Sequence, residues 1–146
     1  MTIANTDRTI DMTVSKDWQQ DSVISLFDEI SALAAGIELR PVSAIENIVD
    51  DIPSFWVDKN KLCKLMHALK HDLSKPFDMC FDLSAVDETE RQNKANCVSD
   101  FTINYHLRSH QRNQDIRLKV AINIKDKNID SVCSIWANAN WYEREV

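Results

Sequence analysis

The sequence predicts an α+β domain of two layers, with amphipathic helices packed on one face of a mostly antiparallel sheet. Two segments repeat apolar residues at the three- and four-residue spacing of a helix face, and others alternate apolar and polar residues as half-buried strands do. Their order is helix, two strands, helix and three strands, which favours helices gathered on one side of a sheet. With 146 residues, 44% hydrophobic and 27% charged, the chain suits one domain with its own core.

Residues 1–16 show no periodicity and are expected to form a mobile leader, which leaves 17–146 as the domain. The first helix is expected from Asp17 onward, and Gly36, the only glycine, stands where a helix commonly ends. Its apolar stripe consists of Val23, Leu26, Phe27, Ile30, Leu33 and Ala34. Strands are expected over 37–42, where Pro41 favours a sheet edge, and over 53–57.

The second helix is expected to begin after Asp58 as its N-cap and to end before Pro76. Its stripe consists of Leu62, Leu65, Met66, Leu69 and Leu73. A strand over 77–83 should then bury Phe77, Met79, Phe81 and Leu83 on one face, followed by a loop over 84–99. Segments 101–107 and 116–124 alternate and predict an antiparallel hairpin with a connection longer than two residues. A turn over 125–128 and a short helix or irregular segment over 129–136 complete this part.

The C-terminal residues combine tryptophans with an acid-base-acid triplet, Glu143-Arg144-Glu145. Asn140 followed three residues later by Glu143 resembles a capping box, which predicts a short helix beginning at Asn140. One and a half turns of helix are marginal alone, so other parts of the chain must hold this segment.

The motif Asn138-Ala-Asn-Trp-Tyr-Glu-Arg-Glu-Val146 resembles the signature of the C-type subunit, also called the 30 kDa-type subunit, of respiratory complex I. Three further blocks, 77–87, 100–109 and 112–120, resemble the same family in the same order, and in particular the bacterial form in which the C-type and D-type subunits are fused. That family continues after the triplet with an Asp-x-Phe-Gly turn, whereas this sequence stops first, so the domain is expected to be truncated there.

The resemblance implies a peripheral-arm subunit of complex I, a NADH:quinone oxidoreductase, that carries no cofactor. It would brace the D-type subunit (the 49 kDa-type subunit), which forms the quinone pocket with the B-type subunit. NAD, FMN, iron–sulfur clusters and quinone would belong to the assembled complex, which couples NADH oxidation to proton translocation. The chain would lie peripherally on the cytoplasmic side of the inner membrane. The homologous subunit of a membrane-bound hydrogenase is a related alternative.

Composition excludes several classes of function, without reference to the family resemblance. A net charge of −6 argues against nucleic-acid binding, and no apolar run approaches the roughly 18 residues of a membrane span. The start of the chain lacks the features of a secretory signal. One glycine cannot build a phosphate-binding loop. The four cysteines have no close spacing and favour ordinary buried thiols over a metal site, and they are Cys63, Cys80, Cys97 and Cys133.

For the other candidate sites, the sequence favours ordinary surface roles over metal binding or catalysis. His67 and His71 are four residues apart but face away from the second helix's apolar stripe, which indicates surface histidines and no metal site. A stand-alone enzyme would have to use His106 with His110, or a group of carboxylates expected to lie on a solvated loop. These carboxylates are Asp82, Asp87, Glu88 and Glu90.

The expected subunit interface draws on the C-terminal motif and on the basic hairpin. The hairpin carries Arg108, His110, Arg112, Arg117 and Lys119, and the resemblance favours contact with a neighbouring subunit there. For Trp136, Trp141 and Tyr142, core and interface explanations stay equally open. The interface residues expected are Trp141, Tyr142, Glu143, Arg144, Glu145, Arg112 and Arg117.

Overall fold

The structure is a computed structural model that describes residues 25–33, 35–42, 52–90 and 99–146. The expected leader, residues 17–24, Ala34 and residues 43–51 lie outside the described residues, as does Cys97. Residues 25–33 are helical, and Gly36 follows with a φ of 83°, a left-handed conformation that an L side chain would disfavour. The expected end of the first helix is therefore confirmed.

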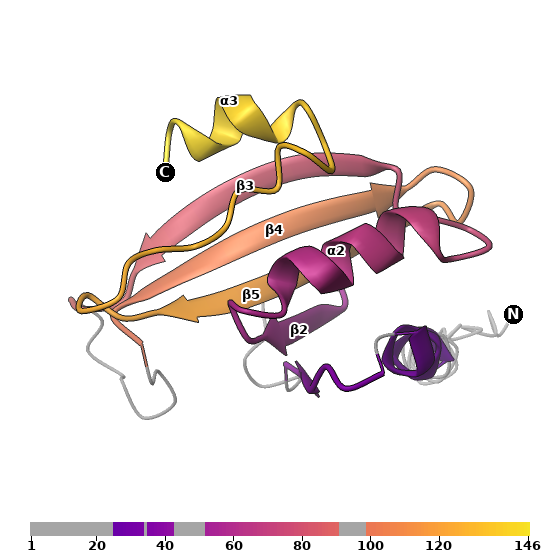
Figure 1. The fold of residues 1–146 in the computed structure, drawn as a ribbon, viewed down its shortest axis with the longest axis horizontal. Coiled ribbons are helices and arrows are strands. Elements are labelled where there is room, and N and C mark those ends of the chain that lie inside the picture. The colour runs from indigo at the N-terminus through magenta and orange to yellow at the C-terminus, as the bar shows by residue number, and fades with distance from the viewer. Residues whose placement is uncertain (1–24, 34, 43–51, 91–98) are drawn as a thin grey trace, which may run out of the picture.

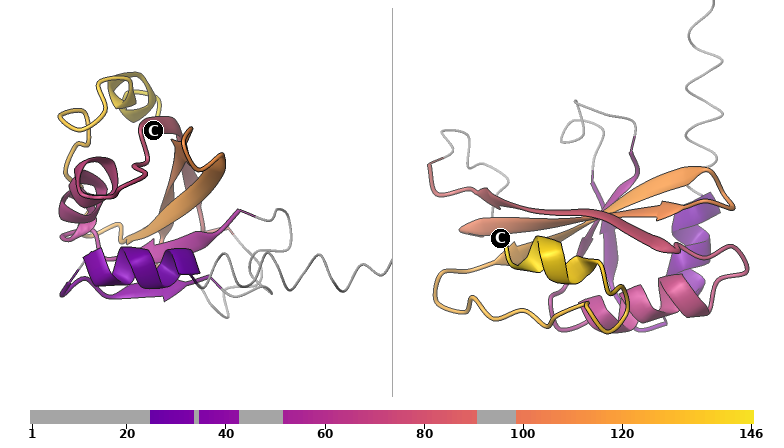
Figure 2. Two further views of the ribbon diagram at one scale, coloured as in Figure 1. Left: turned by 90° about the vertical axis from the view of Figure 1, so that its right-hand side faces the viewer. Right: turned by 90° about the horizontal axis from the view of Figure 1, so that it is seen from above.

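Five strands form one sheet in the order β1-β2-β5-β4-β3 (Figure 1). They are β1 (Leu39–Pro41), β2 (Ser54–Val57), β3 (Met79–Asp87), β4 (Phe101–Ser109) and β5 (Gln114–Ile122). Among these described strands, β2 and β5 pair in parallel, while the other neighbours are antiparallel. Helices α2 (Leu62–His71) and α3 (Ala139–Glu143) lie on the same side of the sheet (Figure 2), so the predicted two-layer α+β fold is confirmed.

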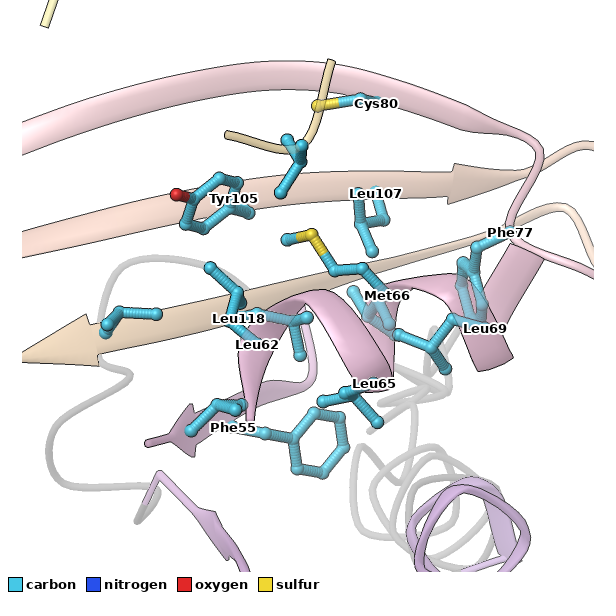
Figure 3. Packing of buried hydrophobic residues seen from close by; sticks show 14 of the residues in the cluster. Phe55, Leu62, Leu65, Met66, Leu69, Phe77, Cys80, Tyr105, Leu107 and Leu118 are labelled. Carbon is cyan, nitrogen blue, oxygen red and sulfur yellow. The ribbon is translucent and has the colours of Figure 1, made fainter. Parts of the chain in front are cut away.

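The core lies between α2 and the sheet (Figure 3). The stripe on α2 is buried as predicted, and it faces apolar side chains from β2, β4 and β5. The central members of this cluster are Phe55, Leu62, Leu65, Met66, Leu69, Tyr105, Leu107 and Leu118. Phe27 of the first helix stacks on Phe55 with ring centroids 5.9 Å apart, which attaches that helix to the same core.

The hairpin of β4 and β5 follows the predicted pattern, except that β5 ends at Ile122 and Ile124 is 52% exposed in the turn beyond it. Every register pair from Phe101 with Ile122 to Ser109 with Gln114 is in place. Residues 110–113 connect the two strands, and Asn113 adopts a φ of 49°, which an asparagine tolerates in a turn. The longer connection was therefore predicted correctly.

The prediction for β3 was wrong in two respects. A register shift between Cys80 and Asp82 interrupts the alternation, so Cys80 is fully buried and Phe81 is 51% exposed. A β-bulge places two residues opposite one, which moves the next side chain to the other face. The strand also continues to Asp87, so residues 84–87 belong to the sheet and not to a loop.

The prediction for the start of α2 was also wrong. Its N-cap residue is Lys61, and no side chain caps the helix there. Asp58 instead accepts a 2.8 Å hydrogen bond from the backbone N–H of Asn60, which stabilises the turn before the helix. The segment over 129–136 is irregular, with a turn at 133–135.

Candidate interaction surface at the C-terminal end

The short helix α3 is held by contacts to elements far away in the sequence. Trp136, just before it, is buried, and Lys70 of α2 donates a hydrogen bond to the carbonyl of Ile135. Asn138 donates a 2.7 Å hydrogen bond from Nδ2 to the carbonyl of Cys80 in β3. Tertiary contacts thus supply the support that five helical residues lack alone.

The expected capping box is not formed. Asn138, not Asn140, is the N-cap residue, and its side chain makes no capping bond. Asn140 lies inside the helix, and the Glu143 carboxylate is engaged elsewhere. It accepts 2.7 Å hydrogen bonds from the Ser131 hydroxyl and the Val132 N–H, and it lies 3.2 Å from the Cys133 thiol. Glu143 therefore ties α3 to the preceding loop, because that loop's donors lie within its reach.

The remaining residues of the motif differ in how far their side chains are exposed to solvent. Trp141 is 70% exposed, and Arg144 and Glu145 are exposed beside it, whereas Tyr142 packs partly on the core. Within the described ranges, no side-chain hydrogen bond or ion pair involves the guanidinium of Arg144. An exposed tryptophan next to an exposed arginine has the composition of an interface hot spot.

Most basic residues of the hairpin are neutralised within the chain. Arg112 makes a two-pronged contact with Glu29 at 2.7 and 2.8 Å, and its Nε donates to the Lys75 carbonyl at 2.6 Å. Arg108 pairs with Asp115 at 3.0 Å, and His110 pairs with Asp78 at 2.9 Å. Arg112 therefore fastens the hairpin to the first helix and presents little charge outward.

Arg117 occupies the opposite face of the sheet, away from α2. Together with neighbours on β3 and β4 it lines a polar hollow of about 280 Å³. The hollow is lined by Asp82, Ser84, Asn104, His106, Arg117 and Lys119. Sequence reasoning missed it, although the alternation of β3, β4 and β5 places these residues on one face.

The ion pair of Arg112 with Glu29 makes stability depend on pH. The hydrogen bond from Arg112 lowers the pKa of the Glu29 carboxyl below its ordinary value of 4.5. A lowered folded-state pKa stabilises the domain above pH 4.5, and this contribution is lost as the pH falls through the folded-state pKa. We expect Glu29→Ala to cost about 0.5–1 kcal/mol at neutral pH, a value reduced because the carboxylate is partly exposed.

Denaturant unfolding of the variant and the parent at neutral pH and at about pH 3 measures this difference, which should shrink in acid. Asp28→Ala is the matched control, since Asp28 is the exposed neighbour on the same helix. A cost for Glu29→Ala that persists unchanged in acid would contradict this role of the ion pair.

The structure places Asp82 and His106 side by side in the polar hollow, but it separates the other residues of the alternative sites. The rings of His67 and His71 lie 4.5 Å apart on the exposed side of α2, and the described residues contain no group of three metal-ligating side chains. His106 lies 3.5 Å from Asp115 without a hydrogen bond, whereas His110 pairs with Asp78. The two histidines thus contact different carboxylates, which gives no nucleophile-and-base arrangement.

The carboxylates from Asp82 to Glu90 are equally dispersed. Asp82 lines the polar hollow, and Asp87 accepts hydrogen bonds from the backbone N–H and hydroxyl of Thr89. Glu88 is buried at 3% exposure, contrary to the expected solvated loop, and its backbone N–H donates a 2.9 Å hydrogen bond to the Asp100 carbonyl at the end of the sheet. Burial raises the pKa of the Cys80 thiol to about 11, so this cysteine is unreactive near neutral pH.

An apolar groove of about 470 Å³ lies between the sheet and the C-terminal segment. Leu83, Ala85, Phe101 and Ile103 form its sheet wall, and Val146 contributes to its other side. Nothing in the sequence pattern indicates this groove.

None of the described helices is both long and apolar enough to cross a membrane.

These features define a two-layer α+β domain whose C-terminal end exposes an aromatic and a cationic side chain. Residues 55–146 match the family described as the 30 kDa subunit of the respiratory-chain NADH dehydrogenase. The chain belongs to this family.

Curated relatives named as the C/D subunit of NADH-quinone oxidoreductase are similar to the chain. The protein from Psychrobacter cryohalolentis is 50% identical over 103 residues, and the protein from Nitrosospira multiformis is 39% identical over 107 residues. These matches cover 70% and 73% of this chain but only 17% and 18% of those relatives. The chain thus spans about a sixth of the length of the curated relatives it matches.

A solved structure of a trypsin-resistant fragment of Nqo5 is similar in fold. It is 16% identical, with a TM-score of 0.57, and the match covers 88% of this chain and 89% of that chain. At this identity the likeness shows the fold alone.

Proposed function

We propose that this chain is a structural domain of NADH-quinone oxidoreductase that docks on and braces the quinone-site subunit, which is the D-type (49 kDa-type) subunit. The observation that carries the proposal is the exposure of Trp141 on α3 and of Arg144 directly after it, at a helix that tertiary contacts hold in place. A rigid support presents an aromatic anchor and a two-pronged donor at low entropic cost. Family membership and the C/D names of the relatives support the identity of the partner.

In this proposal the chain holds no cofactor itself. NAD, FMN, iron–sulfur clusters and quinone bind elsewhere in the assembly, and the D-type subunit is fused in the same polypeptide or associates as a separate one. The B-type subunit completes the quinone pocket. The domain lies peripherally on the cytoplasmic side of the inner membrane, and it supports the transfer of electrons from NADH to quinone and the coupled translocation of protons.

The test is to delete residues 17–146 from the full-length polypeptide and to purify the complex that forms. We expect the D-type subunit to be recovered poorly with the other peripheral-arm subunits, and NADH-driven quinone reduction to fall with it. A complex of normal composition and activity would contradict the bracing role. Quinone reduction by the isolated domain with NADH would instead show an enzyme.

A further inference from the structure

The sheet face opposite α2 carries the polar hollow of about 280 Å³. Helices α2 and α3 both lie on the other face (Figure 2), so the hollow is separate from the apolar core. Six side chains from three neighbouring strands line it in two rows across the sheet. The first row consists of Asp82, His106 and Arg117, and the second consists of Ser84, Asn104 and Lys119. The register between the strands thus determines which side chains meet there.

Arg117 and Lys119 concentrate positive charge in the hollow of a chain whose net charge is −6. They stand two positions apart on β5, so both side chains point to the same face of the sheet. The ammonium of Lys119 also lies 5.7 Å from the centroid of the Trp56 ring on β2, and this contact helps to hold it in place. A guanidinium has five N–H donors and an ammonium has three, so each group can bind an anion beside any contact that it makes within the chain.

Two hydrogen-bond acceptors line the same hollow. The ionised carboxylate of Asp82 accepts hydrogen bonds and donates none. Oδ1 of Asn104 is buried and has no hydrogen-bond partner among the described residues. A buried acceptor without a donor is unfavourable, and a ligand that carries an O–H group supplies the donor. Cations beside acceptors therefore indicate a ligand that is an anion and a hydrogen-bond donor at the same time.

We propose that the hollow binds inorganic phosphate, which at neutral pH is a mixture of ions with one and two O–H groups. Its oxygens accept hydrogen bonds from Lys119 and from Arg117, whose planar guanidinium matches two phosphate oxygens. One O–H group donates to the Asp82 carboxylate, and the second, where present, donates to Oδ1 of Asn104. The hollow is several times larger than the roughly 30 Å³ that one water occupies, so it admits a small polyatomic ion. The exposed pair on and after α3 does not line it, so phosphate binding and subunit docking can fail independently.

The first measurement is a nuclear magnetic resonance titration of the 146-residue chain with inorganic phosphate and with sulfate, at neutral pH and constant ionic strength. Phosphate should shift the side-chain signals of Asn104 and His106 in a saturable manner. Sulfate has a similar shape but no O–H group at neutral pH, so the Asp82 carboxylate repels it without a compensating hydrogen bond. We expect sulfate to bind at least about tenfold more weakly. Equal affinities, or phosphate shifts that do not saturate at these residues, would overturn the proposal.

The second measurement repeats both titrations on variants that circular dichroism shows to be folded. Arg117→Gln and Lys119→Gln should each weaken phosphate binding at least about tenfold. Lys64→Gln is the matched control, because this exposed lysine lies on α2, on the other side of the sheet. Asp82→Asn replaces a side chain that only accepts by one that also donates, so it should narrow the difference in affinity between phosphate and sulfate.

Three results with the variants would contradict the site. The first is unchanged phosphate affinity in a folded Arg117→Gln or Lys119→Gln chain, and the second is an equal loss of affinity in Lys64→Gln. The third is an unchanged difference between phosphate and sulfate in Asp82→Asn, which would show that the ligand's O–H group is not recognised there.

Discussion

Leu118→Asp is expected to abolish the folded domain. Leu118 is fully buried in the middle of β5, where it pairs with Tyr105 of β4 on one side and Phe55 of β2 on the other. Figure 3 shows it beneath α2, next to Leu62. A carboxylate at this place would have no cationic partner and no water, which costs at least about 4 kcal/mol. The total stability of such a domain is roughly 5–15 kcal/mol.

Circular dichroism and thermal denaturation of the variant measure this effect. The matched control is Ala121→Asp, which places the same carboxylate on the same strand at an exposed position of the opposite face. We expect the control to melt within a few degrees of the parent, because exposed substitutions change stability by about 0.5 kcal/mol or less. A cooperative transition of Leu118→Asp near the parental melting temperature would mean that the face of β5 is assigned wrongly.

The hairpin could be predicted because its pattern is purely local. Residues 116–122 alternate without interruption, and each apolar side chain at the alternating positions is buried as a period of two requires. In β3 the same reasoning misplaced Phe81, because a bulge depends on the register with β4 and leaves no mark in the apolar pattern. The two strand predictions differ in outcome for this reason, although their sequences look equally regular.

The C-terminal motif shows a second limit of sequence reasoning. Asn140 and Glu143 have the spacing of a capping box, yet the Glu143 carboxylate binds Ser131 and Val132, which are donors from another loop. A capping motif describes only local partners, whereas the folded chain offers stronger ones nearby. Trp136 and Trp141 could not be separated by sequence either, because the path of the short irregular and helical segment between them decides that one is buried and the other exposed.

The basic hairpin was ambiguous for a related reason. The sequence showed five basic side chains but not the carboxylates opposite them. Glu29 is 83 residues away from Arg112, and Asp78 is 32 residues away from His110. Ion pairs over such separations depend on the tertiary fold. The structure therefore leaves Trp141 and Arg144 as the strongest candidates for contact with another subunit.

Substitution of this pair should separate assembly from folding. Arg144→Ala and Trp141→Ala are expected to leave the melting temperature of the isolated domain nearly unchanged, because both side chains are exposed and Arg144 has no side-chain partner among the described residues. At an interface, loss of a paired arginine would cost about 2–5 kcal/mol, mostly as faster dissociation. Truncation of a central tryptophan has a comparable cost of about 2 kcal/mol or more.

Glu143→Ala is the matched control on the same helix. Its carboxylate is used within the domain, so this variant should lower the domain's melting temperature by the loss of hydrogen bonds to a charged group, each contributing about 1.5–3 kcal/mol. Thermal denaturation of each isolated domain, beside co-purification of the other peripheral-arm subunits with each full-length variant, gives both quantities. Destabilised Arg144→Ala and Trp141→Ala domains that still assemble normally would show that these two side chains serve the fold, and the docking surface would then have to lie elsewhere.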